Sequence, residues 1–292
     1  AGGKVVVVGG GPAGLAAARI AAARGHAVVL FEKEAALGGQ INLAARATWR
    51  EALSGIPRWL AGQVTKLGVD VRLGTAATAE MVAAEAPDVV VIATGGRPNL
   101  EEVVGAEHCT TTWDVLTGTV DAAGSVLLYD ATGQHHGAST AEVLARKGCL
   151  VEIATQDRMV GEEIGTTNQP VHLRELYRHG VVMSPNLELI EVYPEGNRLV
   201  AALRNTMTGA EEERLVDRVV VEYGTLPVDG VYQALRAASV NDGVTDLAAL
   251  VAGRPQPWDE APGMALYRIG DAVAGRNIHA AIYDALRLCK DI

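Results

Sequence analysis

The residues of this sequence best suited to bind a ligand are three glycines. Gly9, Gly11 and Gly14 fit the pattern G-x-G-x-x-G directly after an apolar run at residues 5–8. Gly9 permits a tight turn, Gly11 lets the backbone approach a diphosphate, and Gly14 lets a helix pack closely on a strand. The N-terminus of that helix adds free N–H groups and the positive end of a dipole. These residues therefore predict diphosphate binding.

The elements around the turn complete a strand–helix–strand unit. Four valines at residues 5–8 predict a strand buried on both faces, and residues 15–24 and 27–31 predict a helix and a second strand. Glu32 follows, 18 positions after Gly14, where a carboxylate accepts hydrogen bonds from an adenosine ribose and repels a 2′-phosphate. We expect FAD or ADP at this first site and not NADP. The alternative is a glycine turn that binds nothing.

Three further stretches supply the remaining candidates for this site. The Gly38-Gly39-Gln40 turn follows the first unit, the buried strand 89–92 leads into a second glycine turn, and Gly270-Asp271 precedes a helix over about 277–290. Parallel strands bring their carboxyl ends to one edge of a sheet, where α/β folds bind ligands. The predicted cofactor-binding residues are Gly9, Gly11, Pro12, Ala13, Gly14, Glu32, Lys33, Gly39, Gln40, Ala93, Thr94, Gly95, Gly270 and Asp271.

A second strand–helix–strand unit starts at residue 125. When the two units are aligned on the glycine that ends each helix, three ligand-facing positions differ: Gly9 becomes Thr132, Gly11 becomes Gln134 and Glu32 becomes Thr155. A glutamine side chain obstructs the usual diphosphate pose, and no acid remains for a ribose. We therefore expect no NAD(P)H at this second site. We interpret His135 and His136 as an exposed polar loop and not as a metal or proton-relay pair.

The composition of the chain excludes several classes of function. A net charge of −10 without a Lys/Arg cluster argues against nucleic acid. No apolar run is long enough to span a membrane and no signal peptide is evident, so we expect a cytoplasmic protein that binds no membrane. The three cysteines form no C-x-x-C, so a redox disulfide, a cysteine-bound metal or an iron–sulfur cluster is not expected. The start without Met suggests processing or a longer polypeptide.

The order of the predicted elements indicates an α/β fold with two Rossmann-like domains, the second inserted into the first. We place the FAD- or adenine-nucleotide-binding domain at residues 1–118 and 223–292, and the inserted NAD(P)-like domain at 119–222. A single amphipathic helix is predicted over 49–67, with Trp59 in the core. The stretch 103–115 is predicted to be irregular.

Together these motifs resemble the flavoproteins with two dinucleotide-binding domains. The resemblance rests on V-G-G-G-P-A-G-L, F-E-K, A-T-G-G-R-P and I-G-D-A, and it covers essentially the whole chain. L-G-G-Q-I-N-L-A and R-W-L-x-x-Q-V-x-K-L-G-V-D-V are similar to the C-terminal half of 2,4-dienoyl-CoA reductase, trimethylamine dehydrogenase and related N-demethylases. The sequence at residues 223–227, Y-G-T-L-P, departs from the usual R-x-P-N pattern.

This resemblance implies a partner. In those proteins a TIM barrel carries FMN, the substrate pocket and a 4Fe-4S cluster, so the barrel is expected here on a partner subunit or an upstream domain. In the reductase branch the C-terminal half binds FAD and a nicotinamide nucleotide. In the trimethylamine dehydrogenase branch the first site holds ADP, and electrons leave to an electron-transfer flavoprotein. Thr132, Gln134 and Thr155 place this chain closer to the second branch.

Three hypotheses about function follow. The first is the nucleotide-binding subunit or part of a flavin-dependent dehydrogenase that oxidises a methylated amine or reduces an unsaturated acyl thioester. The second is a self-contained FAD-dependent NAD(P)H oxidoreductase, which needs both nucleotide sites. The third is a non-catalytic assembly subunit in which ADP only stabilises the fold. None of them assigns a catalytic residue to this chain.

Overall fold

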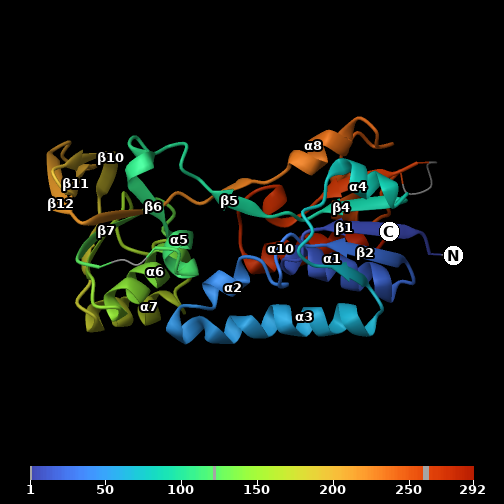
Figure 1. Cartoon of the computed structure of the whole chain (residues 1–292), viewed down its shortest axis with the longest axis horizontal. Helices are drawn as coiled ribbons and strands as arrows, with labels where there is room; N and C mark the ends of the chain where they lie inside the picture. Colours follow the sequence, from blue (N-terminus) through green and yellow to red (C-terminus); the bar gives the residue numbers. More distant parts are fainter. Residues whose placement is uncertain (1, 121–122, 259–262) are drawn as a thin grey trace. The chain divides into compact units, whose positions relative to one another are not determined.

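Two units make up the fold in the computed structural model, which describes residues 2–120, 123–258 and 263–292. Unit 1 comprises residues 1–42, 52–97 and 225–292, and unit 2 comprises residues 43–51 and 98–224. Figure 1 shows the whole chain, coloured along the sequence, with its elements labelled. Each unit has its own parallel sheet and its own core.

Unit 1 is built on a five-stranded parallel sheet. The strand order is β15 (Ala265–Arg268), β4 (Val89–Ile92), β1 (Lys4–Val8), β2 (Ala27–Phe31) and β3 (Asp70–Arg72). The valines of β1 lie at 0–4% exposure because helices cover both faces of the sheet. This burial explains the unbroken apolar sequence of the strand.

Helices cover the two faces of this sheet in two groups. One core joins the sheet to α1 (Pro12–Ala23), α3 (Gly55–Lys66) and α10 (Ile278–Cys289), and the other joins it to α4 (Ala79–Ala84) and α8 (Gly230–Arg236). Figure 1 shows α1 and α3 on one side of β1 and β4, and α4 and α8 on the other. Unit 1 also contains α9 (Leu247–Ala252) and η3 (Gly270–Ala272).

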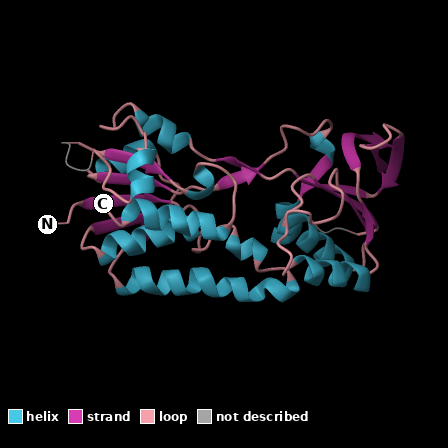
Figure 2. Cartoon of the chain, turned by 180° about the vertical axis from the view of Figure 1, so that it is seen from behind, coloured by secondary structure: helices cyan, strands magenta, loops and turns pink. Residues whose placement is uncertain are grey.

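Unit 2 repeats the arrangement on a second five-stranded parallel sheet. Its order is β6 (Cys109–Thr111), β13 (Arg218–Glu222), β7 (Ser125–Asp130), β8 (Leu150–Ala154) and β9 (Val182–Ser184). One face packs against α5 (Thr112–Thr117), α6 (His135–Arg146) and α7 (Gln169–Arg178). An antiparallel sheet covers the other face, formed by β10 (Leu187–Glu195), β11 (Arg198–Asn205) and β12 (Glu211–Val216). Figure 2 separates these strands from the helices by colour.

The internal repeat is visible residue by residue. Helices α1 and α6 both have 12 residues, and β2 and β8 both have five, each pair offset by 123 positions (135 − 12 and 150 − 27). The α/β fold with two Rossmann-like domains, the second inserted into the first, is therefore confirmed. Four short elements lie where the chain passes between the units: α2 (Ile41–Ala44), η1 (Thr48–Ser54), β5 (Gly96–Pro98) and β14 (Thr225–Pro227). A further short element, η2 (Ala106–His108), belongs to unit 2.

The boundary between the units differs from the expected residue 118. Residues 98–118 belong to unit 2 because β6 pairs in parallel with β13, with Cys109 opposite Val219, and because Val115 of α5 lies in the unit 2 core. The stretch 103–115 was expected to be irregular, and that expectation is wrong. Thr111 and Asp114 form a capping box that starts α5.

The expectation of one helix over 49–67 is also wrong. A 3₁₀ segment, η1, comes first, and α3 starts at Gly55 with Pro57 in its first turn, where a missing N–H costs no hydrogen bond. Trp59 is 56% exposed and not in the core. Its ring lies under the guanidinium of Arg19, whose Cζ is 5.6 Å from the ring centroid.

Candidate functional site

The first glycine turn lies in unit 1 between the end of β1 and the start of α1. Gly9 has a φ of +109°, and a Cβ there would overlap the carbonyl oxygen of Ala93. A Cβ on Gly14 would overlap the carbonyl oxygen of Gly9, so glycine lets α1 pack this closely on the turn. These contacts are the geometry that the two residues were expected to provide.

Gly11 serves a different purpose, because open space surrounds it. The nearest atom to a Cβ placed there is the Cα of Gly39, at 4.0 Å, so two glycine backbones face one another without side chains. Helix α1 begins at Pro12 with no side-chain cap, which leaves N–H groups of its first turn for an anion. This arrangement fits a diphosphate.

Glu32 is 6% exposed at the end of β2 and anchors the turn. Its Oε2 accepts a hydrogen bond from the N–H of Gly10 at 2.6 Å, and its Oε1 accepts one from the N–H of Glu34 at 2.8 Å. Each carboxylate oxygen has a second lone pair, so Glu32 can also accept a ribose hydroxyl. Lys33 is exposed and pairs with Glu34 at 3.7 Å.

The other predicted residues meet beside this turn. Gln40 Nε2 donates to Asp271 Oδ2 at 3.2 Å and lies 3.7 Å from where a Cβ on Gly95 would be. Gly270 has a φ of +61°, and a Cβ there would come within 2.9 Å of the Cβ of Ala13. Three loops distant in the sequence therefore converge at the start of α1.

Two of the predicted residues, Ala93 and Thr94, make contacts within the protein. Ala93 is 6% exposed and belongs to the core against α1. The hydroxyl of Thr94 donates a hydrogen bond to the carbonyl of Val228. The N–H of Val228 in turn donates a hydrogen bond to the carbonyl of Gly95. The side chain of Ala93 thus packs in the core, and that of Thr94 forms a hydrogen bond within the protein.

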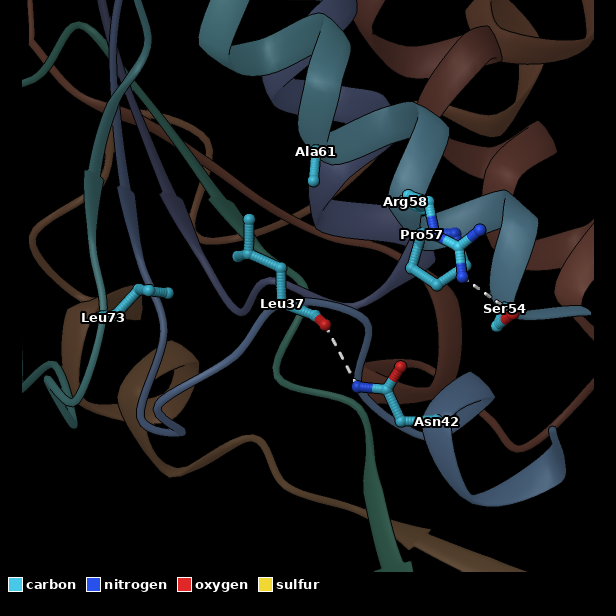
Figure 3. Close-up of a pocket in the computed structure, with 7 residues that line it drawn as sticks. All are labelled: Leu37, Asn42, Ser54, Pro57, Arg58, Ala61 and Leu73. Atoms are coloured by element: carbon cyan, nitrogen blue, oxygen red, sulfur yellow. Dashed lines mark hydrogen bonds between the residues drawn. The ribbon is translucent and has the colours of Figure 1, made fainter. Parts of the chain in front are cut away.

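A hollow of about 380 Å³ adjoins the turn, and no sequence motif predicted it. Figure 3 shows the residues that line it: Leu37, Asn42, Ser54, Pro57, Arg58, Ala61 and Leu73. A Cβ on Gly10 would meet both Leu37 and Glu32, so the hollow begins where the turn ends. Its residues come from three separate stretches of unit 1, which explains why no motif marks them.

The corresponding turn of unit 2 is built around a buried carboxylate. Asp130, at the end of β7, is 1% exposed, and its Oδ1 accepts from the N–H groups of Thr132 at 2.9 Å and Gly133 at 3.1 Å. Burial raises the pKa of Asp130 to about 7, against these hydrogen bonds. Glu222 lies opposite Asp130 on β13 and adds to the rise.

Beside this turn, two histidines and a tryptophan pack together. His135 Nδ1 lies 2.9 Å from His172 Nε2, and the Trp49 ring meets His172 edge to face at a centroid distance of 4.8 Å. Burial, with Arg50 nearby, lowers the pKa of His135 to about 4 and that of His172 to about 3. The expectation of an exposed polar loop is therefore wrong for His135, which starts α6 and is partly buried.

Several other expectations concern the whole chain. Cys149 and Cys289 are buried and Cys109 is partly exposed, and all three are free thiols. Across residues 2–120, 123–258 and 263–292, no cluster of three or more His, Cys, Asp or Glu side chains could hold a metal ion. Within the same ranges, every helix is too short or too polar to cross a membrane.

Known proteins resemble this chain along almost its whole length. N,N-dimethylglycine/sarcosine dehydrogenase of Chromohalobacter salexigens is 48% identical over 302 residues, which cover 99% of this chain and 44% of that protein. The multifunctional alkene reductase/demethylase OYE of Caballeronia cordobensis is 45% identical over 98% of this chain and 43% of its own length. The chain thus spans less than half of these relatives.

A solved structure and a family pattern agree with these similarities. The 2-naphthoyl-CoA reductase complex superposes on all of this chain, and on 40% of its own, with a TM-score of 0.83 and 28% identity. The pattern of the family described as pyridine nucleotide-disulphide oxidoreductase matches residues 3–246. The match covers unit 2 and the part of unit 1 that precedes residue 247. The chain belongs to the pyridine nucleotide-disulphide oxidoreductase family.

Proposed function

We propose that this chain is the adenine-nucleotide-binding part of a flavin-dependent oxidoreductase complex of the amine-oxidising N-demethylase type. The observation that carries the proposal is the open space between Gly11 and Gly39 in front of the uncapped start of α1. A diphosphate satisfies the N–H groups there without meeting a side chain. The dehydrogenase and demethylase relatives support the reaction class.

The bound group is FAD or ADP. Gly9, Gly11 and Gly14 leave room for the diphosphate. Pro12 and Ala13 are the first two residues of α1. Glu32 accepts hydrogen bonds from the ribose hydroxyls. FAD, when bound, would supply hydride and electron transfer, whereas ADP would only stabilise the fold. A flavin would extend the ligand towards the remaining predicted residues, which are Lys33, Gly39, Gln40, Ala93, Thr94, Gly95, Gly270 and Asp271.

The adenine ring is assigned to the hollow beside the turn. Leu37 and Leu73 offer it apolar surface, and the guanidinium of Arg58, which is 3.5 Å from Ser54 Oγ, adds a cation beside the ring. The hollow begins at Leu37, next to the Gly10–Glu32 hydrogen bond that marks the ribose end. Adenosine and diphosphate thus fall on adjoining parts of unit 1.

The chemistry on substrate belongs to a partner. We assign FMN, the substrate pocket and the 4Fe-4S cluster to a TIM barrel, either a separate subunit or an upstream domain, with an electron-transfer flavoprotein as electron acceptor. The relatives' length supports this division, because this chain matches only 44% of the dehydrogenase and 43% of the alkene reductase/demethylase. We propose that the complex works in the cytoplasm.

Release of the bound nucleotide tests the proposal. The purified chain is denatured with acid, and the supernatant is separated by chromatography with FAD, FMN and ADP standards. We expect about one FAD or one ADP per chain, the first giving a yellow protein and the second a colourless one. A chain that copurifies with neither, and that neither stabilises when added, would contradict the proposal. Bleaching of bound flavin by NADH or NADPH would instead favour a self-contained oxidoreductase.

A further inference from the structure

The second glycine turn is built around a carboxyl group of the protein itself. We propose that the buried side chain of Asp130 binds the backbone of this turn in place of a diphosphate, and that Trp49, His135 and His172 close the same turn. Unit 2 therefore takes no nicotinamide nucleotide. All four residues belong to unit 2, so their effect on this turn does not depend on which nucleotide the first site holds.

The anchor of the turn has moved between the two units. In unit 1 the turn is anchored by Glu32 from the neighbouring strand, which keeps free lone pairs for a ribose. In unit 2 that position is Thr155, and the anchor is Asp130 from the same strand as the turn. Asp130 aligns with Val7, 123 positions earlier. Unit 2 therefore has an acidic side chain at the position where unit 1 has an apolar one.

The carboxylate lies against the start of α6. A Cβ on Gly137, the third residue of that helix, would overlap Asp130 Oδ2, and this oxygen has no hydrogen-bond partner within the part of the chain that the structure describes. The carboxyl group thus lies inside the protein at the positive end of the α6 dipole. The N–H groups of Thr132 and Gly133 already donate to Asp130 and are not available to a diphosphate.

The turn itself has a different backbone. In unit 1 the positive φ falls on Gly9, whereas in unit 2 it falls on Gly133, which aligns with Gly10. The hydroxyl of Thr132 donates to Asp130 Oδ1 at 2.8 Å and accepts from the N–H of Gln134 at 3.3 Å. Side chains therefore accept the hydrogen bonds that the backbone N–H groups of the turn donate, and no ligand is needed as an acceptor.

Aromatic rings cover the same end of α6. His135 is the first residue of the helix, where Pro12 stands in unit 1, and its ring meets the fully buried His172. Trp49 packs edge-on against His172, and Arg46 of the same segment donates to the carbonyl of Leu116 at 2.5 Å. Residues 43–51 are thereby held within unit 2.

Hydrogen–deuterium exchange of the nucleotide-loaded wild-type protein tests the inference without any substitution. NADH and NADPH are added separately at about 1 mM, a concentration that would populate a site of ordinary affinity. We expect unchanged exchange in the peptides that contain residues 43–51 and 130–137. Saturable protection of residues 130–137 by either nucleotide would overturn the inference, and its location separates this result from any binding at residues 9–14.

A matched pair of variants isolates the role of Asp130. The first carries Trp49→Ala, Thr132→Gly and Gln134→Gly, and the second carries the same three changes with Asp130→Val. We expect NADPH and NADH to bind at least about tenfold more tightly to the second variant than to the first. Equal affinities in two folded variants would overturn the assignment to Asp130. Nucleotide release from the first site reports folding, and it also tests the proposed function separately.

Discussion

At the residue scale, each glycine turn depends on a few atoms whose replacement has distinct effects. In unit 1 a side chain at Gly14 has no room, whereas one at Gly11 has room until a ligand arrives. In unit 2 the acid Asp130 takes over the anchoring of the turn. Stability and ligand binding can therefore be changed separately.

Gly11→Val should remove the bound nucleotide while leaving the fold intact. The new side chain fills the space before Gly39 that a diphosphate needs. Among the described residues other than Gly11 and its two chain neighbours, the atom nearest to its Cβ is the Gly39 Cα, at 4.0 Å. We expect at least about a tenfold loss of copurifying nucleotide. Gly62→Val, at an exposed position in α3 with open surroundings, is the control and should retain the nucleotide. Full retention in Gly11→Val would place the diphosphate elsewhere.

Gly14→Ala should destabilise unit 1 because the added methyl group overlaps the Gly9 carbonyl oxygen. Overpacking of this kind costs about 1–3 kcal/mol of unfolding free energy. Gly62→Ala in the exposed part of α3 should have the opposite effect, stabilising by up to about 1 kcal/mol through helix propensity. Urea denaturation of both variants measures the two changes. Equal stability of wild type and Gly14→Ala would show that α1 can move away from the turn at little cost.

Asp130→Asn should stabilise unit 2 increasingly as the pH rises. The folded-state pKa of Asp130 is raised from 3.8 to about 7, so the wild type loses stability as pH rises from about 4 to 7, where only the unfolded chain ionises freely. The difference between variant and wild type should grow by about 3 kcal/mol between pH 5 and pH 8. The amide oxygen preserves the hydrogen bonds from the turn.

Asp217→Asn is the matched control for this pH dependence. Its carboxylate accepts hydrogen bonds from Ser125 and lies 3.5 Å from Arg198, which lower its pKa. The stabilisation by Asp217 is lost as the pH falls, so this variant should change most at neutral pH and least in acid. Urea midpoints across the pH range measure both variants. A difference for Asp130→Asn that does not vary with pH would refute its raised pKa.

At the element scale, residues 43–51 are the least expected part of unit 2. They follow the Gly39-Gln40 loop of unit 1 closely in the sequence but pack with α5 through Arg46 and with α7 through Trp49. A segment of four-residue helix and 3₁₀ turn has little stability of its own. Its order therefore depends on these tertiary contacts.

Trp49→Ala should free this segment for proteolysis. Cleavage by trypsin after Arg46 and Arg50 requires local unfolding, which the Trp49–His172 contact opposes in the wild type. We expect at least about a tenfold increase in the cleavage rate at these two sites, read by mass spectrometry of the fragments. Trp59→Ala removes an exposed ring in unit 1 and should leave the rate unchanged. Equal rates in all three proteins would show that Trp49 does not hold the segment.

Local sequence predicted the elements that have strong periodicity or a glycine pattern. Both strand–helix–strand units, and the helix at 278–289, follow from such patterns. The division at residue 118 could not be predicted correctly, because the pairing of β6 with β13 joins residues that are 110 positions apart. The His135–His172 pair, 37 positions apart, and the hollow around Leu37 are likewise products of tertiary packing.

At the scale of the whole molecule, a nucleotide bound to one unit should stabilise that unit selectively. ADP at about 100 times its dissociation constant adds about 2.7 kcal/mol to the unit that binds it. We expect added ADP or FAD to slow hydrogen exchange in the core of unit 1, around β1 and α1, and to leave the core around β7 and α6 unchanged. Equal slowing in both cores would contradict a single nucleotide site.

The path of the chain has a consequence for experiments that divide the protein. The polypeptide passes from one unit to the other at 42/43, 51/52, 97/98 and 224/225, so neither unit is one continuous stretch. Deleting residues 98–224 and rejoining the ends would leave residues 43–51 without α5, α6 and α7. We expect such a deletion to expose Trp49 and to aggregate unless residues 43–51 are also replaced by a short polar linker.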